Sequence, residues 1–488
     1  MNTKALRQKV LDLAIHGKLV PQNPKDESAT VLLEKIRAEK TEKIKKGELK
    51  ADKKDSFIFV GSDKRHYEQF ADGTVKDIED EIPFEVPNGW AWTKIHCVSS
   101  EILYGVSESA KENGKYKLLR ITDIQDDKVN WDSVPFTDFP EDKVINYILR
   151  NGDIVFARTG ATVGKSYLIE NLTVESIYAS YLIRIRTSLL LNPKYMKYYF
   201  GSLTYWSQIT DKSSGIGQPN VNGTSLANLY IPIPPYNEQE RILPVIEKTF
   251  KLIDSLENDA EDLQIAIKQT KSKILDLAIH GKLVPQDPND EPAEELLKRI
   301  ATSDNRPYEK IEEEPFEIPA SWRWALLKNV GIKTDTGYPF DSTKFTTESK
   351  NRNAIIRIRD IVRGFSETFS DEVCPDSYVV NTGEILIGMD GDFNIAKWKS
   401  KPALLNQRVC RIKKSINEIN LDYFFYLLPI PLLEINKSTS SVTVKHLSNK
   451  QIENVLFPIP PVLEQDRIVK TIEDLFSRLD QIQNNLVY

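Results

Sequence analysis

Three short stretches of the sequence contain residue types that could do chemistry. Residues 160–166, GATVGKS, resemble a phosphate-binding loop, in which backbone amides and a lysine hold phosphate groups. That motif needs four residues between its glycines, and this stretch has three, so we expect no ATP binding here. Residues 233–236, IPPY, contain a Pro-Pro-aromatic turn that can hold an amine for methyl transfer, but Ile233 stands where Asn or Asp is needed. Residues 215–217, GIG, lack a third glycine. The sequence therefore predicts no catalytic residue.

Histidine and cysteine do not form a metal-binding pattern. His16 and His280 occupy matched positions near helix ends, and no second ligand accompanies either, so a capping or packing role is expected. The cysteines are Cys97, Cys374 and Cys410, and their spacing fits neither a metal site nor a disulfide framework. Free cysteines are typical of a reducing compartment. We expect no bound metal and a location in a reducing cytoplasm.

The sequence is organised as one unit used twice. Residues 9–27 recur at 273–291, with sixteen of nineteen positions identical. Two further pairs follow in the same order, with diverged sequence between them: 81–92 with 314–324, and 231–242 with 457–468. A repeat of this kind predicts a repeated architecture.

The ends of the chain complete this repeat. The central segment 237–285 is unbroken, whereas its second copy is divided between the two termini. The C-terminal piece ends at the equivalent of residue 262, and the N-terminal piece begins at the equivalent of residue 265. We therefore expect residues 484–488 and 1–4 to lie in one interrupted helix.

The central segment carries a heptad pattern. Seam residues recur in steps of four and three from Ile242 to Leu277, and the C-terminal copy repeats the pattern from Ile468 to Leu486. One helix leaves the first half of the chain and the other leaves the second half, so we expect them to pack antiparallel. At ~1.5 Å per residue, the central helix would be roughly 64 Å long.

Two diverged modules lie between the copied segments. Module 1, residues 81–235, and module 2, residues 314–461, mix short β-type runs with aromatic helical stretches, which predicts an α+β domain in each half. The expected fold class is α+β, with two homologous domains separated by two long helices in an antiparallel coiled coil, pseudo-twofold and circularly arranged. The expected boundaries are 1–60 for an N-terminal helical segment and linker, 61–235 for the first domain, 236–310 for the central helix and linker, 311–461 for the second domain, and 462–488 for the C-terminal helix.

Composition restricts the class of protein. The chain has 488 residues, 40% of them hydrophobic, which is enough for two or three cores. It has no apolar run near 18 residues, so we expect no membrane span. The net charge of −6 is not that of a protein that coats nucleic acid, so nucleic-acid binding would depend on local patches.

The paired motifs resemble those of a known family. The LDLAIHGKLVPQ segments, the Pro-x-x-Trp-x-Trp entrances and the PIPP-x-x-EQ-x-RI exits are similar to those of the specificity subunit of type I restriction-modification enzymes. The resemblance implies two target-recognition domains, each reading one half of a bipartite site in double-stranded DNA, and no catalysis by this chain. It also implies two docked methyltransferase subunits and restriction subunits beyond them. S-adenosylmethionine, ATP and Mg²⁺ would be bound by those partners.

The residues that contact DNA are expected on loops that can enter a groove, because base reading needs bidentate donors and acceptors. In module 1 the candidates are Arg158, Thr159, Lys165, Lys212, Ser213, Ser214, Gln218 and Asn220. In module 2 they are Arg359, Arg363, Met389, Asp390, Lys397, Lys437, Ser438, Thr439, Ser440 and Lys445. Lys9 and Lys273, on the duplicated helices, are expected to contact partner subunits.

Two other classes of protein compete with this hypothesis. Residues 100–230 hold 14 Lys and Arg against 14 Asp and Glu, so a scaffold whose modules bind proteins is an alternative. The second rival is a nuclease or methyltransferase in its own right, which the absent nucleotide and amine-holding motifs disfavour.

Overall fold

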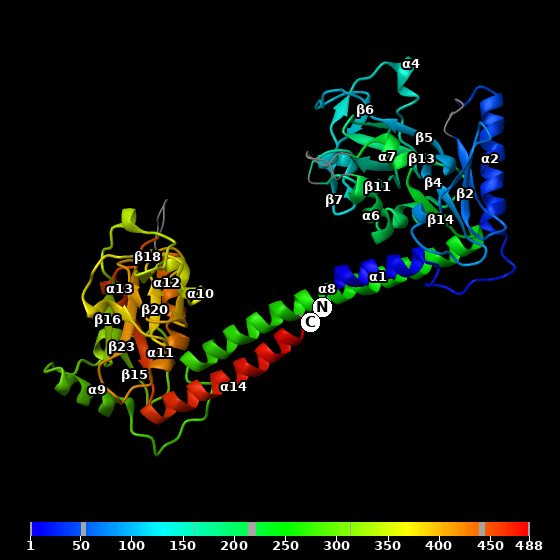
Figure 1. The fold of residues 1–488 in the computed structure, drawn as a ribbon. Coiled ribbons are helices and arrows are strands. Elements are labelled where there is room, and N and C mark those ends of the chain that lie inside the picture. Colours follow the sequence, from blue (N-terminus) through cyan, green and yellow to red (C-terminus); the bar gives the residue numbers. More distant parts are fainter. Residues whose placement is uncertain are drawn as a thin grey trace. The chain divides into compact units, whose positions relative to one another are not determined.

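The chain forms two compact units, Met1–Asp259 (unit 1) and Ala260–Tyr488 (unit 2) (Figure 1). The computed structural model describes residues 2–49, 55–160, 162–212, 221–312, 314–438 and 445–486, with the side chains of 211, 212 and 486 left out. Each unit contains one α+β module and the helices beside it. Among the described residues, no helix combines the length and the apolar content that a membrane span requires.

Unit 1 begins with two helices and a small sheet. The sheet has no counterpart among the described residues of unit 2. The helices are α1 (Thr3–Ile15) and α2 (Ala29–Lys45). The sheet is antiparallel in the order β1-β2-β3, formed by β1 (Ser56–Val60), β2 (His66–Phe70) and β3 (Val75–Asp77). The strands of module 1 then follow: β4 (Ala91–Lys94), β5 (Ser99–Tyr104), β6 (Tyr116–Leu119), β7 (Ile124–Gln125), β8 (Lys128–Val129), β9 (Phe136–Thr137), β10 (Ile154–Ala157), β11 (Ser166–Leu168), β12 (Ser176–Tyr178), β13 (Leu182–Thr187) and β14 (Tyr230–Ile233). Its helices are α3 (Ile95–Val98), α4 (Glu141–Val144), α5 (Pro193–Tyr199), α6 (Leu203–Lys212) and α7 (Gly223–Ala227).

The central sheet of module 1 separates two layers of core. Its strand order is β11-β10-β13-β5, all antiparallel. Side chains alternate between the faces of a strand, so Ile154 and Phe156 pack with α5 and α6, whereas Val155 packs with Tyr178 from the smaller sheet β12-β6-β9. The entrance strand β4 pairs with the exit strand β14, so module 1 closes where it begins.

Unit 2 repeats this plan. After the end of a long helix that it shares with unit 1, it contains α9 (Ala293–Ser303). Its strands are β15 (Arg323–Leu326), β16 (Ile332–Thr336), β17 (Asn353–Ile356), β18 (Phe369–Ser370), β19 (Val379–Val380), β20 (Ile385–Gly388), β21 (Ile395–Lys397), β22 (Ala403–Leu405), β23 (Val409–Lys414) and β24 (Leu456–Ile459). Its other helices are α10 (Ile358–Arg363), α11 (Leu421–Leu427), α12 (Pro429–Ser438), α13 (Asn449–Glu453) and α14 (Val462–Leu486). The central sheet has the order β16-β23-β20-β21, and β15 pairs with β24 as β4 pairs with β14.

The long helix α8 (Tyr236–Ile279) passes from unit 1 into unit 2 and confirms the expected central helix. In unit 1 it packs antiparallel to α1, because Arg7 contacts Asp254 and Glu257 whereas Gln22, beyond the end of α1, contacts Glu238 (Figure 1). A helix with an apolar stripe is stabilised mainly by such packing.

In unit 2 the helix α14 takes the place of α1. Lys271 of α8 pairs with Asp480 near the end of α14, whereas Gln286, beyond the end of α8, donates to Glu464 near its start (Figure 1). The expected antiparallel pairing is therefore present in each unit. The heptad pattern is not buried along its whole length, because Leu256 in unit 1 and Leu263 in unit 2 are 46% and 38% exposed.

The copied segments fold into the same junction in both units. Gly17 and Gly281 follow α1 and α8 in the left-handed conformation, with φ of 65° and 67°. A Cβ at Gly17 would lie 2.5 Å from Cγ of Pro87, and one at Gly281 would overlap Pro319 in the same way. The end of the helix is therefore packed against the entrance of the module, and glycine is needed there for both its conformation and its size.

We expect Gly281→Ala to destabilise unit 2 by about 2–5 kcal/mol, the sum of left-handed strain and overpacking. Gly47→Ala is the matched control, because Gly47 also follows a helix at positive φ, of 75°, and a Cβ added there would meet no atom within 4 Å. Denaturant unfolding of the two variants measures the difference. Equal losses in the two variants would contradict the packing argument.

Candidate functional site

Two loops of module 1 meet at one end of its central sheet. One loop connects β10 to β11 and begins at Arg158, and the other precedes α7. The N–H of Val221 donates to the carbonyl of Arg158 at 3.2 Å, and the N–H of Arg158 donates to that of Tyr181 at 3.0 Å. The structure therefore brings the Arg158 loop beside Tyr181 and the start of α7.

Several residues at this end of module 1 contact one another. The guanidinium carbon of Arg158 lies 5.1 Å from the centre of the Tyr104 ring, and its Nε is buried without a hydrogen-bond partner. The hydroxyl of Tyr104 accepts the N–H of Gly223 at 2.8 Å. Lys165 is exposed and Thr159 is partly exposed. Tyr104 and Tyr181, which are 38% and 62% exposed, were not identified from the sequence.

Module 2 places the equivalent loops together by the same backbone bonds. The N–H of Met389 donates to the carbonyl of Arg408 at 3.0 Å, and the N–H of Leu447 donates to that of Met389 at 2.7 Å. Next to them, the N–H of Gly391 donates to the carbonyl of Lys445 at 3.0 Å. We call these two equivalent regions the loop ends of modules 1 and 2.

The candidates at the loop end of module 2 differ in what their side chains can reach. Met389 is only 4% exposed and packs in the core with Phe393, so its side chain cannot contact a base and the assignment is corrected. Lys397 pairs with Asp422 of α11 at 2.7 Å, away from the loops. The amine of Lys445 donates to Oδ1 of Asn436 at 3.1 Å.

The remaining described candidates lie on α10 and at the end of α12, two helices that contact the loop end of module 2 through Ile358 beside Gly388 and through Asn436, which donates to the carbonyl of Gly391. Arg359 and Arg363 lie on α10, where Arg363 pairs with Glu367 at 2.8 Å. Lys437 pairs with Glu434 at the exposed end of α12, next to Ser438. The candidates that fall outside the described residues are Ser213, Ser214, Gln218, Asn220, Thr439, Ser440 and the side chain of Lys212.

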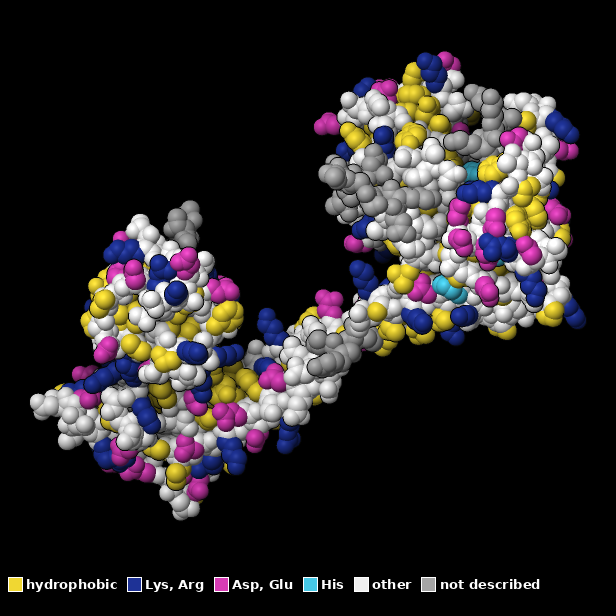
Figure 2. Space-filling model, in the orientation of Figure 1, with side chains coloured by type: hydrophobic (Ala, Val, Ile, Leu, Met, Phe, Trp, Pro, Cys, Tyr) yellow, Lys and Arg dark blue, Asp and Glu magenta, His cyan; other side chains and the backbone are white. Residues whose placement is uncertain are grey.

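Charge on the visible surface is mixed. Figure 2 shows Lys and Arg side chains interspersed with Asp and Glu on the face of each unit. Binding to an anionic polymer through this face would therefore depend on a few placed groups and not on a broad basic field.

A second candidate surface is the junction, where a helix end, the module entrance and the start of the exit helix meet. Its main polar contacts are present in both units. In unit 2, Glu464 is 1% exposed and accepts from Gln286 at 2.7 Å and from the indole N–H of Trp322 at 3.0 Å. Asp290 and Arg467 form an ion pair beside it. In unit 1 the corresponding contacts are Gln22 to Glu238 at 3.1 Å and Arg241 to Asp26 at 2.7 Å.

The lysines expected to contact partner subunits are exposed on the helices α1 and α8. Lys9 is exposed on α1, and no ion pair involving it is found among the described residues. Lys273 is 66% exposed and pairs with Asp276 at 2.6 Å within α8. The two lysines therefore occupy equivalent positions, but only the charge of Lys273 is balanced by an ion pair among the described residues.

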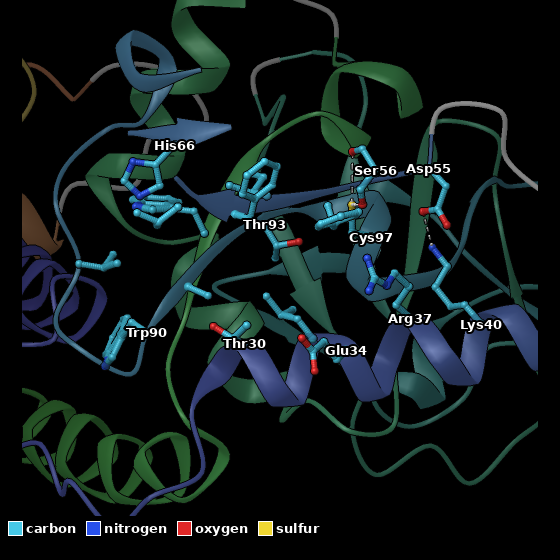
Figure 3. A pocket seen from close by; sticks show the side chains of 18 residues that line it. Thr30, Glu34, Arg37, Lys40, Asp55, Ser56, His66, Trp90, Thr93 and Cys97 are labelled. Carbon is cyan, nitrogen blue, oxygen red and sulfur yellow. Dashed lines mark hydrogen bonds and ion pairs between the residues drawn. The ribbon is translucent and has the colours of Figure 1, made fainter. Parts of the chain in front are cut away.

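A cavity of about 420 Å³ lies between α2 and the strands β1 and β4 (Figure 3). Its walls are a mixture of aromatic, aliphatic and polar side chains, and the aromatic ones include Phe57, Trp90 and Trp92. Near it, Asp55, His96 and Cys97 form the one group of three metal-ligand side chains found within the described residues.

A lysine already provides positive charge at this group. Figure 3 shows Lys40 extending from α2 to Asp55, with Nζ at 3.5 Å from its Oδ1, and the same amine donates to the carbonyl of His96 at 2.9 Å. The arrangement is complete as a partly buried ion pair and does not require a metal ion.

Comparison with known proteins identifies the class that this fold and its two loop ends define. A family model described as the type I restriction modification DNA specificity domain matches residues 105–265 and 326–487. These matches cover more than half of the chain, which therefore belongs to this family. It is a DNA-recognition subunit, the non-catalytic component of a type I restriction-modification system.

Individual relatives agree with the family assignment. The chain is 28% identical to the EcoAI specificity subunit of Escherichia coli, over 98% of this chain and 90% of the relative. It is 39% identical to the E. coli EcoBI specificity subunit over 35% of each chain. A chain solved in work on complex assembly and conformational transition of the type I R-M system covers 83% of this chain and 94% of its own, with a TM-score of 0.56 and 17% identity, and shows the same fold.

The junction carboxylates predict a dependence of stability on pH. Burial raises the pKa of Glu464 above its usual value. The folded chain therefore retains this proton at pH values where the unfolded chain has lost it, and the stabilisation falls as pH rises through the folded pKa. We expect the free energy of unfolding of the wild type, relative to Glu464→Gln, to decrease as the pH rises above about 4, the usual pKa range of a glutamic acid. Denaturant titrations at a series of pH values measure this difference in unfolding free energy. A difference that did not change with pH would contradict a raised pKa for Glu464.

Proposed function

We propose that the chain reads an asymmetric, bipartite site in double-stranded DNA, with each module reading one half-site. The reading domains in this proposal are residues 61–235 and 311–461. The chain would also hold two methyltransferase subunits, with restriction subunits bound beyond them. S-adenosylmethionine, ATP and Mg²⁺ would be bound by those partners, and the complex would act in the cytoplasm, where the DNA is.

One observation supports the proposal that each module reads its own half-site: the two loop ends share a backbone frame and differ in their side chains. The hydrogen bonds of Arg158 to Tyr181 and of Val221 to Arg158 are repeated by those of Met389 to Arg408 and of Leu447 to Met389. At the first of these pairs, an exposed tyrosine in module 1 corresponds to an exposed arginine in module 2. A constant frame with different groups at its end is what two readers of different sequences require.

The duplicated junctions support the stoichiometry of the partners. Unit 1 and unit 2 contain the same Gln–Glu and Asp–Arg contacts in an otherwise diverged chain. Two equivalent surfaces on one chain fit two copies of one partner, as symmetric assemblies generally do. Two methyltransferase subunits per chain are therefore the proposed arrangement.

The direct test is an exchange of module 1. Residues 93–230 run from within β4 to the first residue of β14, two strands that pair with one another, so their replacement by the corresponding span of a relative should leave the junction intact. With the chain in its methyltransferase complex, sequencing of N6-methyladenine should show a new first half-site and an unchanged second half-site and gap. If both half-sites changed, or if neither followed the module, the proposal would be wrong.

Charge reversal tests the docking surface. We expect Lys9→Glu and Lys273→Glu each to reduce the number of methyltransferase subunits bound, as measured by native mass spectrometry. Lys9→Glu should have the larger effect, because Asp276 already compensates the charge of Lys273. Gln substitutions at the same positions separate loss of charge from repulsion. A wild-type complex with one methyltransferase subunit per chain would contradict the proposed stoichiometry.

A further inference from the structure

The turn between β22 and β23 presents one arginine at the loop end of module 2. Arg408 is 53% exposed, and its backbone is fixed on both sides. Its carbonyl accepts the N–H of Met389 at 3.0 Å, and its own N–H donates to Oδ1 of Asn406 at 3.3 Å. The side chain therefore starts from a fixed position and extends into solvent.

A carboxylate holds one side of the guanidinium. Oδ1 of Asp390 lies 3.6 Å from Nη1 of Arg408 and 2.7 Å from Nδ1 of His446. Asp390 is itself anchored, because its backbone forms a β-bridge with His446. Within the part of the chain that the structure describes, neither Nε nor Nη2 of Arg408 has a hydrogen-bond acceptor. Two parallel donors on one edge are thus left available.

We propose that Arg408 binds a guanine base of the second half-site, donating through this edge to O6 and N7 in the major groove. Guanine presents two adjacent acceptors there, which match the two donors of a guanidinium. Asp390 holds the side chain by its other side, which lowers the entropy lost on binding. This inference rests on the proposed function, because it requires that module 2 reads a half-site.

Arg411, on the strand β23 that follows this turn, shows what a structural role looks like in this module. Arg411 is 1% exposed and donates to the carbonyls of Val379 and Ser377 at 2.5 and 2.6 Å, with Asp335 and Glu384 as counter-charges. Module 1 has Arg184, 0% exposed, in the corresponding strand. The buried arginine is kept in both modules.

The exposed position of Arg408, in contrast, holds different residues in the two modules. Arg408 of module 2 corresponds to Tyr181 of module 1, since each accepts the N–H at the end of the neighbouring strand. A contact to the phosphate backbone, which is the same in every sequence, would favour a cation in both modules. A change from arginine to tyrosine at a fixed point of the frame is instead what base reading requires.

The test uses the full chain in its methyltransferase complex, with duplexes that carry the methylated site of the wild type. We expect Arg408→Ala to reduce the preference for guanine at one position of the second half-site by about 5- to 150-fold. Arg408→Lys should restore it only in part, because the flexible ammonium lacks the planar fork that aligns two donors with O6 and N7. Asp390→Asn should weaken the preference at the same position, and the first half-site should be unchanged in all three variants.

Controls separate this inference from the proposed function. Lys328→Ala removes a cation that pairs with Asn454 beside the exit strand, and it should leave both half-sites unchanged. Thermal unfolding of each variant excludes loss of the fold. If Arg408→Ala weakened all sequences equally, with Arg408→Lys restoring binding and the salt dependence falling by about one phosphate contact, Arg408 would be a backbone contact and the inference would be overturned. An unchanged second half-site would overturn it too, whereas a wild-type complex without a bipartite site would remove the proposed function itself.

Discussion

The packing of a helix end against the entrance of a module is the contact on which each unit depends. Gly281 brings the chain so close to Pro319 that no side chain fits between them, and Gly17 does the same with Pro87. In unit 2 the segment after the helix end, the entrance and the start of the exit helix are joined by the buried carboxylate of Glu464, which accepts from Gln286 and Trp322. Because such a group is costly to bury without partners, its hydrogen bonds also fix the geometry of the three elements.

This constraint explains how the modules can differ while their ends remain the same. Each module enters and leaves through one strand pair beside the junction, β4 with β14 and β15 with β24. Side chains at the loop ends take no part in that pairing, so they can change without loss of the frame. Under the proposed function, the junctions would set assembly and the loop ends would set the sequence read.

The repeat made the fold largely predictable from the sequence. Near-identical segments at fixed offsets predicted matched junctions, and the heptad pattern predicted a helix close to the observed Tyr236–Ile279. The short strands β1–β3 gave no comparable signal, because three to five residues carry little periodicity. Their stability depends on contacts with one another, which are not encoded locally.

The candidate site was predictable at the level of loops and not of side chains. The equivalence of Met389 with Arg158 was correct for the backbone, yet the side chain of Met389 lies in the core because the residue continues the buried face of β20. Tyr181 and Arg408 were missed because each is exposed by a short turn between consecutive strands of two different sheets, β12 and β13 or β22 and β23. Which side chain such a turn exposes is decided by strand register, and register is a property of the folded sheet.

A chain with the same module in both units tests the claim that one backbone frame serves two interchangeable modules. Residues 95–229 would replace residues 327–455, between the paired strands of unit 2. The methylated site of this chain, in complex with its methyltransferase, is predicted to contain two copies of the first half-site and to be symmetric. A folded complex that still methylated an asymmetric site would contradict the claim.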